Sequence, residues 1–126
     1  MTNLRIEATS KTPQIDFNSN SGELEILGIS VPENSVAFYT PVVDWLISYV
    51  ANPQHKTVLS LNFSYLNTSS LQFLYDALKE LDEIGAPDSV IINWYFTEDD
   101  DDMKETGEDF KEVTSSSFNF IEVDEI

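Results

Sequence analysis

The sequence predicts a single-domain α/β fold in which a mixed β-sheet carries an N-terminal hairpin or meander and about three helices. Its 126 residues fit one hydrophobic core, and a composition with 41% hydrophobic and 12% aromatic residues can fill that core. After a β-rich start, segments with the period of a strand alternate with segments with the period of a helix. This order is typical of an α/β layer fold with right-handed crossovers. We expect one domain over residues 1–126, the acidic C-terminal quarter 97–126 included.

Short β-favouring runs open the chain. They cover residues 4–8, 14–18 and 23–30, and the turn-rich segment NSNSG separates the last two. Runs of this length joined by turn residues predict the N-terminal hairpin or meander.

A first amphipathic helix follows Pro32. Its core-facing stripe has helical spacing and consists of Tyr39, Val42, Val43, Leu46, Ile47 and Val50. Asn34 or Ser35 can cap this helix, and Pro41 predicts a short first turn followed by a kink or restart.

A second apolar stripe, Phe38, Trp45 and Tyr49, runs beside the first on the same helix. Aromatic side chains are favoured anchors of protein interfaces, so these rings are a candidate partner interface. They are equally consistent with rings that only cover the sheet.

Residues 57–65 alternate apolar and small polar side chains without Gly or Pro and predict a central strand. The second helix follows, and Gly85 and Pro87 end it; its apolar stripe consists of Leu71, Leu74, Leu78 and Leu81. Ser69 and Gln72 have the spacing of a capping box, which puts Thr68 just outside this helix or in its first turn.

The run SVIINWYF at residues 89–96 is nearly all apolar and predicts a strand that is covered on both faces. We expect this strand, with Ile92, to lie next to the central strand that contains Leu59. Met103, Thr106, Phe110 and Val113 form a weaker third helical stripe that Gly107 interrupts. Residues 118–123 alternate again and predict a final edge strand.

The net charge of −17 excludes several classes of partner, because it repels nucleic-acid backbones and anionic membranes. From residue 97 onward there are twelve acidic residues and two lysines, a balance of −10. The chain has no Cys, no apolar run near the roughly 18 residues of a membrane span and no signal-peptide pattern. We expect a cytoplasmic protein without disulfides.

The sequence offers few residues that could catalyse a reaction. His55 is the single histidine and lies in the loop NPQHK, where an exposed position is expected rather than an acid–base role. The four glycines are too far apart for a phosphate-binding loop. The acidic run 98–102 lacks the Gly of a calcium loop and is better explained as a solvated helix N-terminus. We expect no enzyme, no metal and no cofactor.

The segment NTSS is chemically the most suggestive. Thr68, Ser69 and Ser70 are three hydroxyls at the start of a helix, where unpaired backbone N–H groups and the helix dipole tolerate a phosphate. Phosphorylation there would change the surface that a partner meets without melting the fold. The alternative is that these residues only cap a helix in a constitutive adaptor or structural module.

Residues 58–81, VLSLNFSYLNTSSLQFLYDALKEL, resemble the strand–loop–helix of anti-sigma-factor antagonist (STAS) domains. In those domains an Asp-Ser-Ser-Gly segment carries the phosphorylated Ser, and the matching residues here are Asn67, Thr68, Ser69 and Ser70, with Ser70 in place of the Gly.

The chain more closely resembles the SiaC family of regulatory phosphoproteins. The resemblance rests on PENS at residues 32–35, VVDWL at 42–46, YLNTSS at 65–70 and WYF at 94–96, which together span almost the whole chain. The acidic run 98–102 matches no motif of that family.

This resemblance implies a STAS-like fold and a partner switch of bacterial signalling. Thr68 would be phosphorylated by a dedicated protein kinase and restored by a PP2C-type phosphatase. The unmodified form would bind and activate a diguanylate cyclase, a GGDEF protein, and so control cyclic di-GMP and with it biofilm formation or aggregation.

Overall fold

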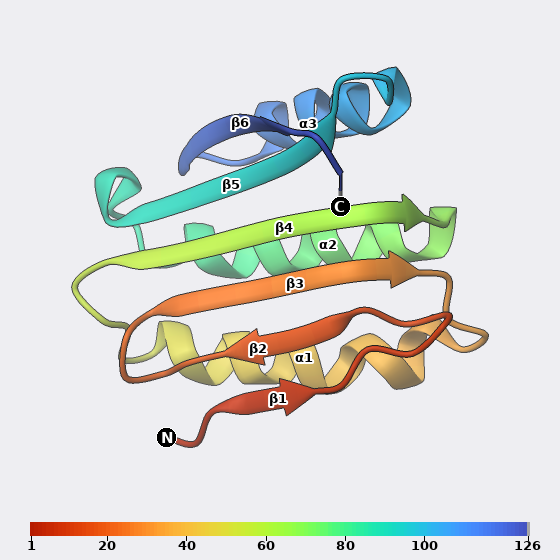
Figure 1. Cartoon of the computed structure of the whole chain (residues 1–126). Coiled ribbons are helices and arrows are strands. Elements are labelled where there is room, and N and C mark those ends of the chain that lie inside the picture. The colour runs from red at the N-terminus through yellow and green to blue at the C-terminus, as the bar shows by residue number, and fades with distance from the viewer. Residues whose placement is uncertain (126) are drawn as a thin grey trace.

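Within residues 1–125, the part of the chain that the computed structural model describes (for Pro87 the backbone only), six strands form one sheet. The strands lie side by side in the order in which they occur along the chain (Figure 1). They are β1 (Leu4–Ile6), β2 (Gln14–Phe17), β3 (Glu23–Ser30), β4 (Thr57–Leu66), β5 (Val90–Thr97) and β6 (Ser117–Val123).

The sheet has an antiparallel part and a parallel part. β1, β2 and β3 form an antiparallel meander, and β3 to β6 run parallel. The parallel strands are joined by α1 (Ser35–Val50), α2 (Thr68–Asp82) and α3 (Asp101–Val113), and a short 3-10 turn, Pro87–Ser89, precedes β5. The predicted mixed α/β sheet, N-terminal meander and three helices are confirmed.

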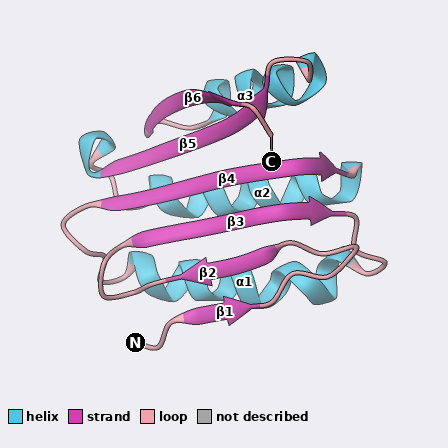
Figure 2. Cartoon of the chain, in the orientation of Figure 1, coloured by secondary structure: helices cyan, strands magenta, loops and turns pink. Residues whose placement is uncertain are grey.

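All three crossover helices cover the same face of the sheet (Figure 2). Each crossover steps to the next strand in the same direction, and crossovers of one hand then place their helices on one side. Within residues 1–125 no helix covers the other face.

The core lies between the sheet and these helices. Leu59 of β4 pairs with Ile92 of β5, so the two strands lie next to each other as predicted. Leu46 of α1 and Leu78 of α2 are fully buried. β4, β5, α1 and α2 supply most of the buried hydrophobic residues of the described core.

β5 differs from the prediction that both its faces are covered. Its side chains alternate between buried and half-buried, with Val90, Ile92 and Trp94 inward and Ile91, Asn93 and Tyr95 on the open face. An apolar run usually indicates a strand between two layers, and that inference is wrong here because no helix of the described chain covers the second face.

α1 is one helix from Ser35 to Val50, and the predicted restart at Pro41 is wrong. Asn34 caps it, as predicted, by accepting a hydrogen bond from the Ala37 backbone N–H at 3.0 Å. Pro41 removes the N–H that would bond the Ala37 carbonyl, and both residues are exposed, so water can satisfy that carbonyl.

α3 continues through Gly107, although the sequence pattern predicted that Gly107 interrupts the helix. A Cβ on Gly107 would lie 2.5 Å from Cδ1 of Trp94 and 2.8 Å from Cε1 of Phe120. Glycine is therefore required for the close approach of α3 to β5 and β6. The indole N–H of Trp94 donates to the Met103 carbonyl at 2.9 Å and fixes the same contact.

Candidate functional site

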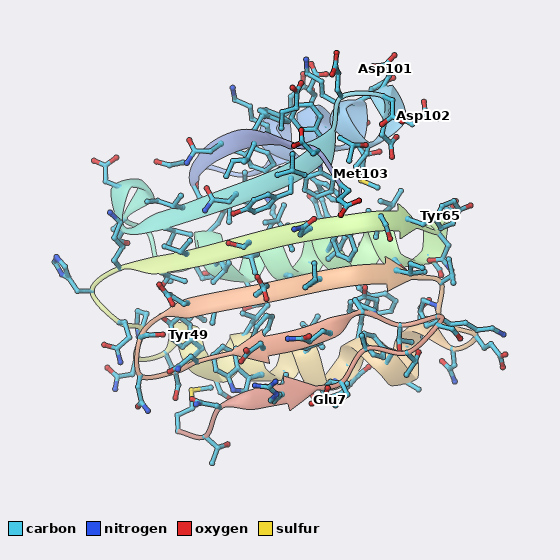
Figure 3. The ribbon with its side chains drawn as sticks, viewed as in Figure 1. Glu7, Tyr49, Tyr65, Asp101, Asp102 and Met103 are labelled. Atoms are coloured by element: carbon cyan, nitrogen blue, oxygen red, sulfur yellow. The ribbon has the colours of Figure 1, made fainter. Side chains whose placement is uncertain are left out.

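The NTSS segment lies at the carboxyl edge of the sheet, where two strand-to-helix turns meet. β3 ends at Ser30 shortly before α1, and β4 ends at Leu66 directly before α2. Tyr65 marks this edge, and Asp101 and Asp102 at the start of α3 lie at the same end of the sheet (Figure 3). Ligand and partner sites of open α/β sheets are commonly found outside the carboxyl ends of the strands.

Asn67 is the N-cap of α2 and Thr68 is its first helical residue. The Asn67 side-chain oxygen accepts a hydrogen bond from the Ser70 backbone N–H at 3.0 Å. The predicted capping box is therefore wrong, and Gln72 instead donates to Asp76 at 3.1 Å. The cap lies at Asn67, two residues before Ser69, because the short side-chain oxygen of Asn bonds the N3 backbone N–H well.

Beneath this turn runs a row of hydrogen-bonded side chains, which we call the hydroxyl chain: Tyr39, Ser30, Ser70 and Asn67. The Tyr39 hydroxyl contacts Oγ of Ser30, Oγ of Ser30 lies 2.8 Å from Oγ of Ser70, and the Ser70 hydroxyl donates to the Asn67 side chain at 2.6 Å. Ser30 and Ser70 are fully buried. The chain links the ends of β3, α1 and α2 and leaves its buried oxygens satisfied.

Burial affects the phenol at the start of this chain. It raises the pKa of Tyr39 above its ordinary value, while the hydrogen bonds to Ser30 and Ser70 oppose the shift. The neutral phenol is therefore the form that the fold favours.

Ser69 is also engaged. Its hydroxyl lies 2.6 Å from Oγ of Ser35 at the start of α1 and donates to Asn67 at 3.2 Å. This contact joins the first turns of the two helices.

Thr68 differs from its neighbours. Its side chain is exposed, as is that of Ser69, but no residue of the described chain makes a hydrogen bond with the Thr68 hydroxyl. The first turn of α2 contains no acidic residue, so the positive end of the helix dipole is not neutralised by a side chain there. Of the three hydroxyls that the sequence singled out, Thr68 is the one without a hydrogen-bond partner among the described residues.

The aromatic stripe of α1 is not exposed as an interface would require. Trp45 is 9% exposed and Tyr49 is 1% exposed. The two rings stack at 5.1 Å, and Phe17 packs against Trp45 at the same distance. Phe38 is half-buried with its edge against Tyr39. For Trp45 and Tyr49 the structure favours the second interpretation, that they cover the sheet.

A groove between α2 and α3 was missed by the sequence analysis. Its volume is about 510 Å³, and it is lined by Thr68, Leu71, Gln72 and Tyr75 of α2 and by Thr106, Asp109, Phe110 and Val113 of α3. Both sets have the spacing i, i+3, i+4, i+7 of one helix face. That spacing is visible in the sequence, but Leu71 and Phe110 were assigned to the core stripes.

The remaining candidate residues have plain structural positions. His55 is exposed in the loop before β4. Asp100 caps α3 by accepting from the Met103 N–H at 3.0 Å, so the acidic run does begin a helix as predicted. Among residues 1–125, no group of His, Cys, Asp and Glu side chains could hold a metal ion, and no helix there is long and apolar enough to cross a bilayer.

Comparison with known proteins shows which family the chain matches. The model of the family described as SiaC family regulatory phosphoprotein matches residues 6–123. An uncharacterised protein of Pseudomonas aeruginosa strain UCBPP-PA14 is 35% identical over 121 residues, which cover 94% of each chain. The crystal structure of apo-SiaC from Pseudomonas aeruginosa is similar with a TM-score of 0.86 and 34% identity, over 96% of this chain and 99% of that one.

A further similar structure contains a partner. It is the crystal structure of the diguanylate cyclase SiaD in complex with its activator SiaC from Pseudomonas aeruginosa. The matching chain has a TM-score of 0.87 and 32% identity, over 95% of this chain and 99% of that one.

Proposed function

Because the chain belongs to the SiaC family of regulatory phosphoproteins, we propose that it is a non-enzymatic partner switch controlled at Thr68. A cognate protein kinase phosphorylates Thr68 and a PP2C-type phosphatase removes the phosphate. The unphosphorylated form binds and activates a diguanylate cyclase of its own organism and so raises cyclic di-GMP. Residues 1–126 act together as one regulatory domain.

The observation that carries this proposal is the contrast among the three hydroxyls of NTSS. Ser70 is buried in the hydroxyl chain and Ser69 is bonded to Ser35 and Asn67. Thr68 and Ser69 are both exposed, but Thr68 alone of the three has no hydrogen-bond partner among the described residues. A kinase needs an acceptor hydroxyl that it can reach without unfolding the helix, and Thr68 meets this requirement.

The structure also supports a local mechanism. Asn67, and not Thr68, caps α2, so a phosphate on Thr68 breaks no capping hydrogen bond. It adds about −1.5 to −2 charges at the positive end of a helix, where such charge is tolerated. The fold persists, and the partner is released because the phosphate blocks a contact.

A direct test is the mass of the protein after co-expression with the kinase of its own organism. We expect one added phosphate, assigned to Thr68 by peptide mapping and removed by the PP2C-type phosphatase. The matched control is Thr68→Ala, which should gain none. A wild-type chain that stays unmodified would contradict the switch, and NTSS would then be a simple helix cap in a constitutive adaptor.

A further inference from the structure

We propose that the groove between α2 and α3 is the surface on which the partner docks, and that Thr68, at the open end of the groove, controls this docking. The inferred occupant is a segment of the partner protein that presents apolar side chains flanked by Lys or Arg. This inference rests on the proposed function and adds the place and the chemistry of the contact.

The floor of the groove is apolar although it lies on the outside of the helix layer. Leu71 and Tyr75 contribute from α2, and Val113 contributes from α3; all three are half-buried and line the groove. Phe110, which is buried, closes the floor. Half-covered aliphatic and aromatic side chains between two helices offer apolar surface that a partner can remove from water.

Hydrogen bonds hold the far end of the groove. Nζ of Lys79 on α2 donates to the Val113 carbonyl at the end of α3 at 3.1 Å. The Asp82 carboxylate accepts from the Thr114 hydroxyl at 2.7 Å and from the Ser116 hydroxyl at 3.1 Å. α2 and α3 are therefore fixed together at their carboxyl ends, and the groove is a preformed feature that costs little reorganisation on binding.

The Thr68 end carries no such tie among the described residues, and it is where the groove meets the carboxyl edge. Thr68 begins the α2 stripe whose next members are Leu71, Gln72 and Tyr75. A phosphate on Thr68 would thus stand on the apolar contact surface itself. Covering it with the apolar side chains of the partner would require a dianion to lose its water, which is unfavourable.

One wall of the groove, which we call its rim, is the acidic helix α3, and the charge of this helix sets the chemistry of the occupant. α3 carries two lysines and six acidic residues: Asp101, Asp102, Glu105, Glu108, Asp109 and Glu112. Both lysines turn to aromatic rings of the sheet, Lys104 over Phe96 at 5.7 Å and Lys111 over Phe120 at 5.9 Å. Asp109 remains in the groove lining. Such a rim favours a segment with basic residues and disfavours a second copy of this chain, whose net charge is also −17.

The test compares two tyrosines on either side of the phosphosite. Tyr75 lines the groove, and Tyr65, which is 59% exposed, lies outside it at the carboxyl edge (Figure 3). Affinity for the diguanylate cyclase of the same organism is measured by calorimetry for Tyr75→Ala, Tyr65→Ala and wild type. We expect Tyr75→Ala to weaken binding about tenfold or more and Tyr65→Ala to bind within about twofold of wild type.

Two further variants, each with one reversed charge, test the inference even if Tyr75→Ala does not fold. Asp109→Lys changes a groove residue, and Glu108→Lys makes the same charge change at an exposed neighbour outside the lining. Asp109→Lys should weaken binding several-fold more than Glu108→Lys, with the difference shrinking at high salt.

Several results would overturn the inference. They are equal binding by Asp109→Lys and Glu108→Lys, a loss in Tyr65→Ala that equals or exceeds the loss in Tyr75→Ala, or a dimer of the chain alone that Tyr75→Ala dissolves. In each of these cases wild type still binds the cyclase and the proposed function stands. Failure of wild type itself to bind is the distinct result that removes the proposed function, and the docking inference with it.

Discussion

The inner and outer sides of the helix layer carry the same types of residue in opposite states. Inside, the rings of Trp45 and Tyr49 are stacked and covered, and the Ser70 hydroxyl is part of a buried chain. Outside, Tyr75 lines a groove and the Thr68 hydroxyl is exposed. Position relative to the one covered face of the sheet, more than residue type, decides which ring or hydroxyl a second protein can reach.

The largest effect should come from an inner ring. Trp45→Ala removes a side chain that packs on Phe17 and Tyr49 and whose indole N–H donates to the Thr2 carbonyl at 2.9 Å. We expect the free energy of unfolding to fall by about 3–5 kcal/mol, measured by urea denaturation. The matched control is Ile47→Ala on the exposed side of the same helix, which should change it by less than about 0.5 kcal/mol.

A Trp45→Ala protein that keeps its stability and loses affinity for the cyclase would reverse this part of the comparison. It would return the α1 rings to the role of partner anchors.

The inner hydroxyl should have a smaller effect. Ser70→Ala removes an inner member of the hydroxyl chain and leaves the buried Ser30 oxygen and the half-buried Asn67 oxygen with fewer partners. Loss of a buried hydrogen-bond partner costs about 1–3 kcal/mol, so the urea midpoint should fall clearly. An unchanged midpoint would mean that the chain does not stabilise the turn beneath Thr68.

The contribution of Tyr39 to the stability of the inner side should depend on pH. Burial raises the pKa of Tyr39 above its ordinary value of 10.0, so the folded protein keeps the proton at pH values where the unfolded chain releases it. The stabilisation is present below pH 10 and is lost as pH rises through the raised pKa. The stability difference between wild type and Tyr39→Phe should therefore shrink above pH 10, and a constant difference from pH 8 to 11 would contradict the buried phenol.

The outer hydroxyl should have the smallest effect on stability. The Thr68 side chain makes no hydrogen bond within the described chain, so Thr68→Ala should change the free energy of unfolding by less than about 0.5 kcal/mol. Thr68→Asp places a carboxylate at a helix start and should stabilise by about 0.3–1 kcal/mol. If either variant lowers the free energy of unfolding by more than about 1 kcal/mol, the Thr68 side chain itself stabilises the start of α2.

Much of the fold could be predicted because the chain alternates two clear periods. The meander, the adjacent strands of Leu59 and Ile92 and the three helices all followed from spacing. β5 was misjudged because the apolar content of a strand does not say on which faces helices pack. Gly107 was misjudged because a glycine that permits close packing has the same letter as one that ends a helix.

The candidate site, like the fold, could be predicted only in part. NTSS could be located at a helix start from the sequence, but its three hydroxyls could not be ranked, since the partners of Ser69 and Ser70 are Ser35 and Ser30, distant in the chain. The groove was missed because it needs α3 beside α2, and Leu71 and Phe110 fit a core stripe equally well until that neighbour is known.

The central claim is that a phosphate at Thr68 changes binding and leaves the fold intact. Its most direct test is a calorimetric titration of Thr68→Ala, Thr68→Asp and phosphorylated wild type against the diguanylate cyclase of the same organism. Thr68→Ala should bind like the unmodified protein, phosphorylated wild type should bind at least about tenfold more weakly, and Thr68→Asp should lie between them because one carboxylate carries less charge than a phosphate. All three proteins should melt within a few degrees of one another. Equal affinity for all three would contradict the switch and leave Thr68 as an ordinary residue in the first turn of a helix.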